Sequence, residues 1–131
     1  MPASLPTLLD VATEVRERLA DEARAEAFRI VADWYGRARR SASDEVERAI
    51  GCRPDSTKDS RWDAMLAGLT EQLCLDQGRP CPRWALAKDR YLATWWFMSP
   101  HASLHPSAFV EAPVALANHG VFIHRADFES L

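Results

Sequence analysis

The side chains best suited to chemistry in this sequence are its four histidines and three cysteines. His101 and His105 stand four residues apart, a spacing that puts two imidazoles on one helix face, but a proline precedes the pair and another follows it. Cys74 and Cys81 are too far apart in sequence for the tight knuckle of a structural zinc site. We therefore expect no bound metal and no cofactor.

Nucleophilic catalysis needs a serine or cysteine beside a base, and the candidates are Cys81, Ser99, His101 and His119. None of them lies in a nucleophile elbow, and the five glycines form no phosphate-binding loop. We expect a protein that is not an enzyme. A hydrolase is the remote alternative, and it would require the fold to bring His101, His105 and His119 together.

Aromatic side chains crowd the stretch from 84 to 97. Trp95, Trp96 and Phe97 are consecutive, so a single helical stripe cannot turn all three toward one core. At least one ring should lie at a surface, where tryptophan is typical of protein-binding hot spots. The sequence predicts a partner-binding surface of Trp84, Trp95, Trp96 and Phe97. The alternative is that Trp95 and Trp96 cover opposite sides of a helix packed between others.

Arg37, Arg39 and Arg40 form the one basic cluster that could contact the phosphates of DNA. Acidic side chains are interspersed around this cluster, and no pair of helices has the pattern of a helix-turn-helix motif. A solvated helix end explains it as well, because cations favour the negative end of the helix dipole. A DNA-associated regulator or dimerisation domain is therefore the alternative function, with nucleic acid the less favoured partner.

Length and composition indicate one small domain. With 131 residues and 47% hydrophobic content the chain can bury one core, so we expect a single domain over 1–131, with 1–27 alternatively a separately packed N-terminal helix. No apolar run reaches the roughly 20 residues of a membrane span. The odd number of cysteines, without a signal segment, favours reduced thiols. We expect a cytoplasmic protein without a membrane partner.

Helix signals begin close to the N-terminus. Thr7 and Asp10 resemble a capping box, and apolar residues then recur at helical spacing to about Arg40. This segment is either one long helix or two helices that break near Asp21.

Two further helices are expected in the middle of the chain. Ser41 or Ser43 can cap a short helix, which Gly51 should end in a left-handed turn. Ser60 opens a capping box for a longer helix, whose apolar stripe runs until Gly78 stops it.

The remaining chain has shorter signals. We expect a helical turn or two around 89–96, a helix over 106–118 that Pro113 kinks or divides, a cap at 118–120, an extended piece at 121–123 and a final turn at 127–131. No alternating pattern predicts a strand. The fold class that follows is all-α, a single irregular bundle of about four to six helices with a long loop and a short extended C-terminal segment.

From about Phe28 onward the chain resembles a small helical domain of bacterial proteins from GC-rich genomes. The resemblance rests on a helix from Phe28 to Arg39, the segment from Asp59 to Gly78, the loop at 82–84, the rings at 95–97 and the ending at 117–123. Such domains accompany helix-turn-helix regulators or nucleotidyltransferase-like toxins, often in antitoxin-type gene pairs. The resemblance implies no catalytic residues.

These observations together favour a non-catalytic, protein-binding module. Its partner would be another protein, in the antitoxin-like case a toxin enzyme that it neutralises, or a second copy of the chain. Trp84, Trp95, Trp96 and Phe97 are the residues expected at the interface.

Overall fold

The computed structural model describes residues 4–99 and 101–129, and they form an all-α fold, which confirms the predicted class. The described residues hold seven α-helices, which are α1 (Leu8–Ala20), α2 (Arg24–Arg40), α3 (Ser43–Ile50), α4 (Ser60–Gln77), α5 (His105–Glu111), α6 (Val114–Asn118) and α7 (Ala126–Glu129). The predicted final turn is α7, and its last two predicted positions lie outside the described residues.

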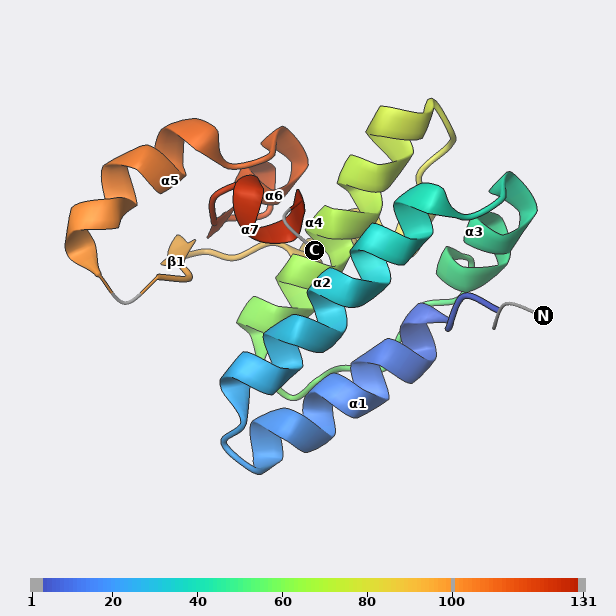
Figure 1. Ribbon diagram of the computed structural model, residues 1–131, viewed down its shortest axis with the longest axis horizontal. Coiled ribbons are helices and arrows are strands. Elements are labelled where there is room, and N and C mark those ends of the chain that lie inside the picture. The colour runs from blue at the N-terminus through green and yellow to red at the C-terminus, as the bar shows by residue number, and fades with distance from the viewer. Residues whose placement is uncertain (1–3, 100, 130–131) are drawn as a thin grey trace.

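The segment from Thr7 to Arg40 forms two helices. The Thr7 side chain accepts a hydrogen bond from the amide of Asp10, as the capping pattern predicts. A turn at 21–23 separates α1 from α2, and Glu22 there has a positive φ of 57°. The helices then lie side by side (Figure 1), and the buried residues of α1 belong to the same core cluster as those of α2.

The predicted ends of α3 are wrong in their details. Its N-cap residue is Ala42, which supplies no side-chain cap, and the Ser41 hydroxyl instead donates to the carbonyl of Arg37 at the end of α2. Gly51 has a φ of −68°, so α3 ends without a left-handed residue.

Helix α4 is capped one residue earlier than predicted. Asp59, not Ser60, accepts a hydrogen bond from the amide of Arg61. Asp63 is buried instead of closing a capping box, and it accepts hydrogen bonds from the amide and the hydroxyl of Thr57. The carboxylate therefore holds the loop before α4 onto the helix. At the other end, Gly78 has the predicted left-handed conformation, with a φ of 64°.

The predicted helical turns around 89–96 are largely wrong. Two short 3₁₀ helices, η1 (Arg83–Leu86) and η2 (Lys88–Arg90), precede an extended segment that contains strand β1 (Trp96–Phe97). Strand β1 pairs in parallel with β2 (Val121–Phe122), and the amides of Leu92 and Trp96 donate to the carbonyls of His119 and Gly120. The backbone of this segment thus bonds to a distant stretch of chain and not to its own preceding turn.

The C-terminal third packs on α4. Pro113 divides the predicted helix into α5 and α6, and Gly120 follows α6 with a positive φ of 88°, as the cap signal at 118–120 predicts. Helix α6 contacts α4, while α7 contacts α2. Strand β2 is the predicted extended piece, and the third 3₁₀ helix, η3 (Ala102–Leu104), leads into α5 at the edge of the molecule (Figure 1). Among the described residues, no helix is long and apolar enough to span a lipid bilayer.

Candidate functional site

Two of the four predicted interface rings are core residues. Trp84 and Trp96 are each 7% exposed. The indole Nε1 of Trp84 donates to the carbonyl of Ile50 at 2.7 Å, and Trp96 packs on Trp62 with their ring centroids 5.8 Å apart. The pairing of β1 with β2 turns Trp96 toward α4. Because both indoles are buried, neither Trp84 nor Trp96 is placed to contact a partner. This corrects the predicted surface.

The exposed ring of the predicted set is Trp95, which is 59% exposed. Its ring packs on Phe109 of α5 and on Phe122 of β2, with centroid distances of 5.4 and 5.2 Å. Phe97 is half-buried between His105 and Phe122. The rings of both residues stack on it, with centroid distances of 4.4 and 5.0 Å. Trp95 is therefore held in place by other rings while most of its surface faces solvent.

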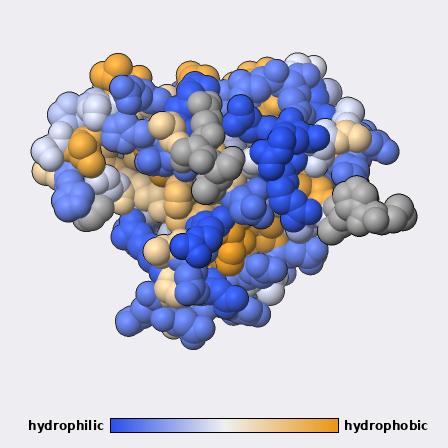
Figure 2. Space-filling view, in the orientation of Figure 1, coloured by the Kyte–Doolittle hydropathy of each residue, from blue (hydrophilic) through white to orange (hydrophobic). Residues whose placement is uncertain are grey.

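Helix α5 extends this exposed surface. Phe109 is 49% exposed, and its neighbour Val110 is 80% exposed. We call Trp95, Phe109 and Val110 the α5 patch. Figure 2 shows apolar side chains at the outer edge of the molecule over α5. The sequence prediction missed Phe109 and Val110. The one buried residue of α5 is Ala108, so the larger apolar side chains of this helix lie outside the core.

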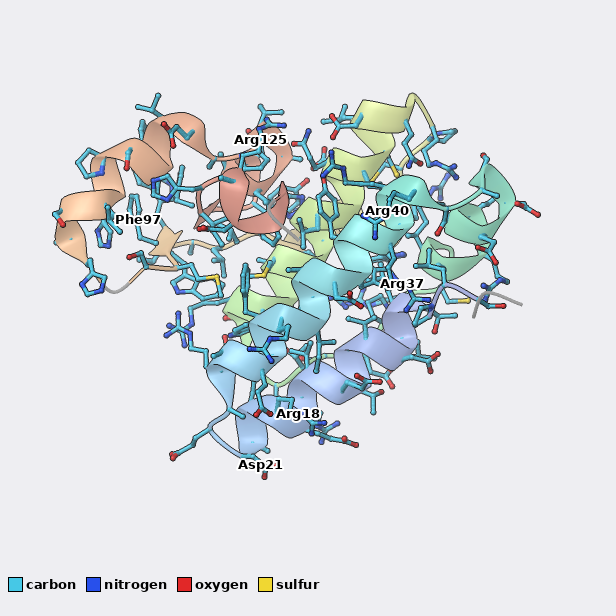
Figure 3. The ribbon with its side chains drawn as sticks, in the orientation of Figure 1. Arg18, Asp21, Arg37, Arg40, Phe97 and Arg125 are labelled. Atoms are coloured by element: carbon cyan, nitrogen blue, oxygen red, sulfur yellow. The ribbon has the colours of Figure 1, made fainter. Side chains whose placement is uncertain are left out.

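The predicted arginine cluster lies at the end of α2, where Figure 3 shows Arg37 and Arg40. Arg37 donates to the carbonyl of Ser4 at 3.4 Å, so it fastens the N-terminal segment onto α2. Arg39 is exposed and lies over the Tyr35 ring at 5.7 Å, and Arg40 is exposed. One of the three cations is thus committed to the fold, and two remain accessible to an anion.

The structure does not gather the histidines into one site. His101 is exposed, His105 stacks on Phe97, and His119 is completely buried. Within the described residues, no group of three or more histidine, cysteine, aspartate or glutamate side chains could hold a metal ion. The arrangement that would favour a hydrolase is therefore not formed.

His119 has a structural partner on each ring nitrogen. Nδ1 lies 2.7 Å from the carbonyl oxygen of Arg90, which can only accept, so Nδ1 carries a proton. Nε2 lies 2.9 Å from Oε1 of Glu71, and one proton must lie between them. Tyr91 stacks on the ring at 4.0 Å. Because both nitrogens are occupied, His119 has no free position with which to take a proton from a substrate.

A second histidine contact has the composition of a catalytic triad but not its geometry. The hydroxyl of Ser107 lies 2.7 Å from Nε2 of His124, and Oε2 of Glu111 lies 3.8 Å from the same nitrogen. In a triad the carboxylate orients the opposite ring nitrogen. The Ser107 hydroxyl also donates to the carbonyl of Leu104, so Nε2 of His124 must donate to the serine and cannot act as its base.

The cysteines are poor nucleophiles where they are enclosed. Cys74 is buried and Cys81 is half-buried, and the two thiols interact with each other. Burial, reinforced by the nearby Cys74 and Glu71, raises the pKa of Cys81 to about 12. Burial also raises the pKa of Cys74. Both groups are therefore neutral thiols at physiological pH, whereas nucleophilic chemistry needs the thiolate.

Trp95, Phe109 and Val110 of the α5 patch each keep about half or more of their surface exposed. Comparison of this chain with protein families, with characterised proteins and with solved structures found no match.

Proposed function

We propose that this protein is a non-catalytic binding module that docks a partner protein on the α5 patch. The observation that carries the proposal is the exposure of adjacent large apolar side chains, Phe109 at 49% and Val110 at 80%, beside a Trp95 that is 59% exposed. Contiguous apolar surface on a small protein is typical of an interaction site.

The geometry of Trp95 supports this proposal. Contacts with Phe109 and Phe122 hold its ring in place before any partner arrives. A ring that is already ordered loses little conformational entropy on binding, so more of the energy of burial appears as affinity. Tryptophan side chains in such positions are typical binding hot spots.

The shape and surroundings of the patch indicate the kind of partner. Helix α5 lies at the outer edge of the molecule (Figure 1), so its apolar side chains would enter a groove on the other protein. A toxin enzyme neutralised by this docking is the narrower form of the proposal. It draws on the resemblance to antitoxin-associated domains and on the lack of a catalytic arrangement among the described side chains.

The test is a charge placed on the patch. Val110→Glu should leave the fold intact because the side chain is 80% exposed, and Leu75→Glu, at a 57% exposed leucine on α4, is the matched control. Tagged full-length wild type and both variants are used to capture proteins from the native host, and each captured protein is then purified. Calorimetric titration should show affinity at least about ten-fold weaker for Val110→Glu, and unchanged for Leu75→Glu.

Other outcomes would replace this function. A wild type that captures nothing, or captures the same proteins as Val110→Glu, contradicts the proposed partner docking.

A wild-type dimer that Val110→Glu converts to a monomer would assign the patch to self-association. DNA binding that weakens steeply with salt, and that is reduced by Arg40→Gln but not by Val110→Glu, would favour the regulator alternative. The antitoxin form requires that the captured protein arrest growth and that wild type, but not Val110→Glu, restore it.

A further inference from the structure

We propose that a cavity between α2, the segment after β1, and the β2–α7 segment binds a small organic carboxylate with an apolar body. The cavity adjoins the proposed partner surface, because Phe122 lines the cavity and also supports Trp95, but the carboxylate proposal does not depend on partner binding. The cavity has a volume of about 460 Å³, within the range of roughly 300–1,000 Å³ for small-molecule sites. Figure 2 shows paler apolar atoms in the recess between the α5 side of the molecule and α2.

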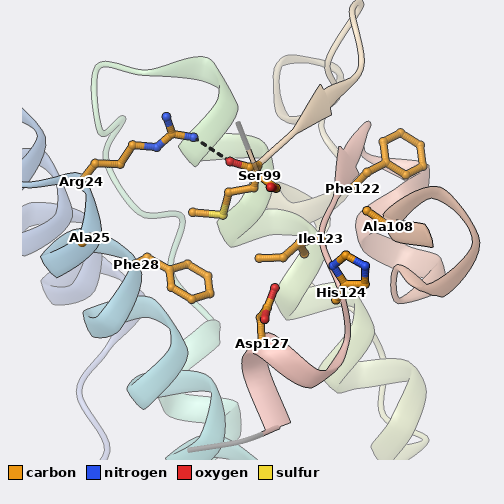
Figure 4. A pocket seen from close by; sticks show the side chains of 10 residues that line it. Arg24, Ala25, Phe28, Ser99, Ala108, Phe122, Ile123, His124 and Asp127 are labelled. Carbon is orange, nitrogen blue, oxygen red and sulfur yellow. Dashed lines mark hydrogen bonds between the residues drawn. The ribbon is translucent and has the colours of Figure 1, made fainter. Parts of the chain in front are cut away.

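The walls of the cavity are mostly apolar. Figure 4 shows Phe28 of α2 on one side and Ile123, after β2, on the other, with Ala108 of α5 farther to the right. Met98 completes the lining. Phe28 and Met98 are partly exposed, so an apolar ligand body would gain burial against both of them.

Arg24 supplies the cation at one end of the cavity. Its Nη2 donates to the carbonyl of Met98 at 3.2 Å (Figure 4), and its guanidinium lies 5.5 Å from the centroid of the Trp96 ring. These contacts hold the side chain while using few of its five N–H donors. Among the ion pairs of the described residues, none joins Arg24 to a carboxylate. The remaining donors match a ligand carboxylate, which arginine binds with two parallel hydrogen bonds.

The position of Arg24 in its helix also favours an anion there. It is the first residue of α2, where a cation is unfavourable for the helix dipole, so helix formation does not explain it. Ala23 at the N-cap supplies no side-chain cap, and Glu26 in the first turn offsets part of the positive potential of this helix end. The cavity and Arg24 define the site.

The other end of the cavity excludes a second negative charge. Figure 4 shows Asp127 of α7 at the end away from Arg24. His124 also lines the cavity, but its Nε2 is engaged by Ser107 at 2.7 Å, so that nitrogen is not available to a second ligand carboxylate. A monocarboxylate fits this distribution of charge, and a dicarboxylate of the same length does not.

The test uses octanoate and octanedioate as probes with the purified full chain. We expect saturable 1:1 binding of octanoate in calorimetry and clearly weaker binding of octanedioate. The chain has three isoleucines, so selective labelling of their δ1 methyl groups locates the ligand. Octanoate should shift the signal of Ile123 and leave that of Ile50, which lies on α3, unchanged.

Two substitutions test the two parts of the site. Arg24→Gln should weaken octanoate binding by about ten-fold or more, because a charge-assisted hydrogen bond is lost. Arg29→Gln, at an exposed arginine on the same helix, is its control. Ala25→Leu should narrow the cavity and weaken binding, whereas Ala20→Leu at the end of α1 should not.

Three results would overturn the proposal. They are the absence of saturable octanoate binding in the millimolar range, octanoate binding that Arg24→Gln and Ala25→Leu leave unchanged, and shifts at Ile50 without any at Ile123. Val110→Glu should bind octanoate as wild type does. Failure of the carboxylate site is therefore distinguishable from failure of the partner surface.

Discussion

Single residues in this protein have roles that their chemical type does not reveal. His119 and Glu71 are a histidine and a carboxylate within hydrogen-bond distance, which elsewhere could be an acid–base pair. Here the imidazole is fully buried and spans from Glu71 on α4 to the backbone of Arg90 on η2. The pair therefore joins three segments of the fold, since His119 is the C-cap residue of α6.

The enclosed thiol of Cys81 predicts a loss of stability in alkali. Its pKa is raised from 9.0 to about 12, mainly by burial, so the folded protein keeps a proton that the unfolded chain releases above pH 9. The stability that this thiol contributes is complete below pH 9 and is lost as the pH rises toward 12. Urea unfolding at a series of pH values should show a flatter decline for Cys81→Ala than for wild type.

The exposed Cys52 provides the control for this measurement. Cys52→Ala should decline with pH as wild type does. An alkaline decline that is equally steep in Cys81→Ala and wild type would show that the Cys81 thiol does not titrate in this way. Burial also raises the pKa of Tyr91, so part of the decline should persist in every variant.

At the scale of elements, the contact between α4 and α6 depends on a glycine. A Cβ atom at Gly68 would lie 2.9 Å from Cδ2 of Leu116 and 3.1 Å from its Cα. The first distance is a clash, and the second involves backbone that cannot move aside alone. Gly68 therefore allows α6 to approach α4 closely, at the expense of helix propensity in α4.

Gly68→Ala should lower the free energy of unfolding by about 1 kcal/mol, within a range of roughly 0–2.5 kcal/mol. The reason is that overpacking costs about 1–3 kcal/mol, whereas the gain in helix propensity is roughly 0.5–1 kcal/mol. Gly36→Ala in α2 is the matched control, because its nearest contact would be an ordinary 3.6 Å to Nη1 of Arg40. That variant should be more stable than wild type by about 0.5–1 kcal/mol in chemical denaturation. Equal effects of the two substitutions would mean that α4 and α6 are not in close contact.

At the scale of the whole molecule, one core cluster links the two ends of the chain. Leu8 of α1, Leu69 of α4 and Phe128 of α7 all belong to it. The ring of Phe128 packs against Phe28 and Tyr35 of α2, with centroid distances of 5.3 and 5.8 Å. Helix α7 thus covers part of the surface of α2 that α1 and α4 leave uncovered.

This shared core predicts one cooperative unfolding transition. Six of the seven α-helices in the described part of the chain contribute residues to the common cluster, α5 being the exception. None of those six can separate without exposing the cluster, so intermediates that lack one of them should not be populated. In scanning calorimetry the van't Hoff and calorimetric enthalpies should agree. Two resolved transitions would instead support a separately packed N-terminal helix, which is the alternative that the sequence leaves open for residues 1–27.

The sequence by itself determined the features that depend on neighbouring residues. The cap at Thr7, the end of α4 at Gly78 and the division at Pro113 all follow from hydrogen bonds and steric limits within one or two turns of chain. Such interactions are local, so a short stretch of sequence contains all the atoms involved.

Only the tertiary structure decided which rings are buried and where a site can form. Trp95 and Trp96 are adjacent and identical in type, and their fates differ because β1 pairs with β2, which turns Trp96 inward and Trp95 outward. The cavity beside Arg24 likewise requires α2, α5 and α7 to meet. The pairing of β1 with β2 leaves no alternating pattern in the sequence, because strands of two residues are too short to show one.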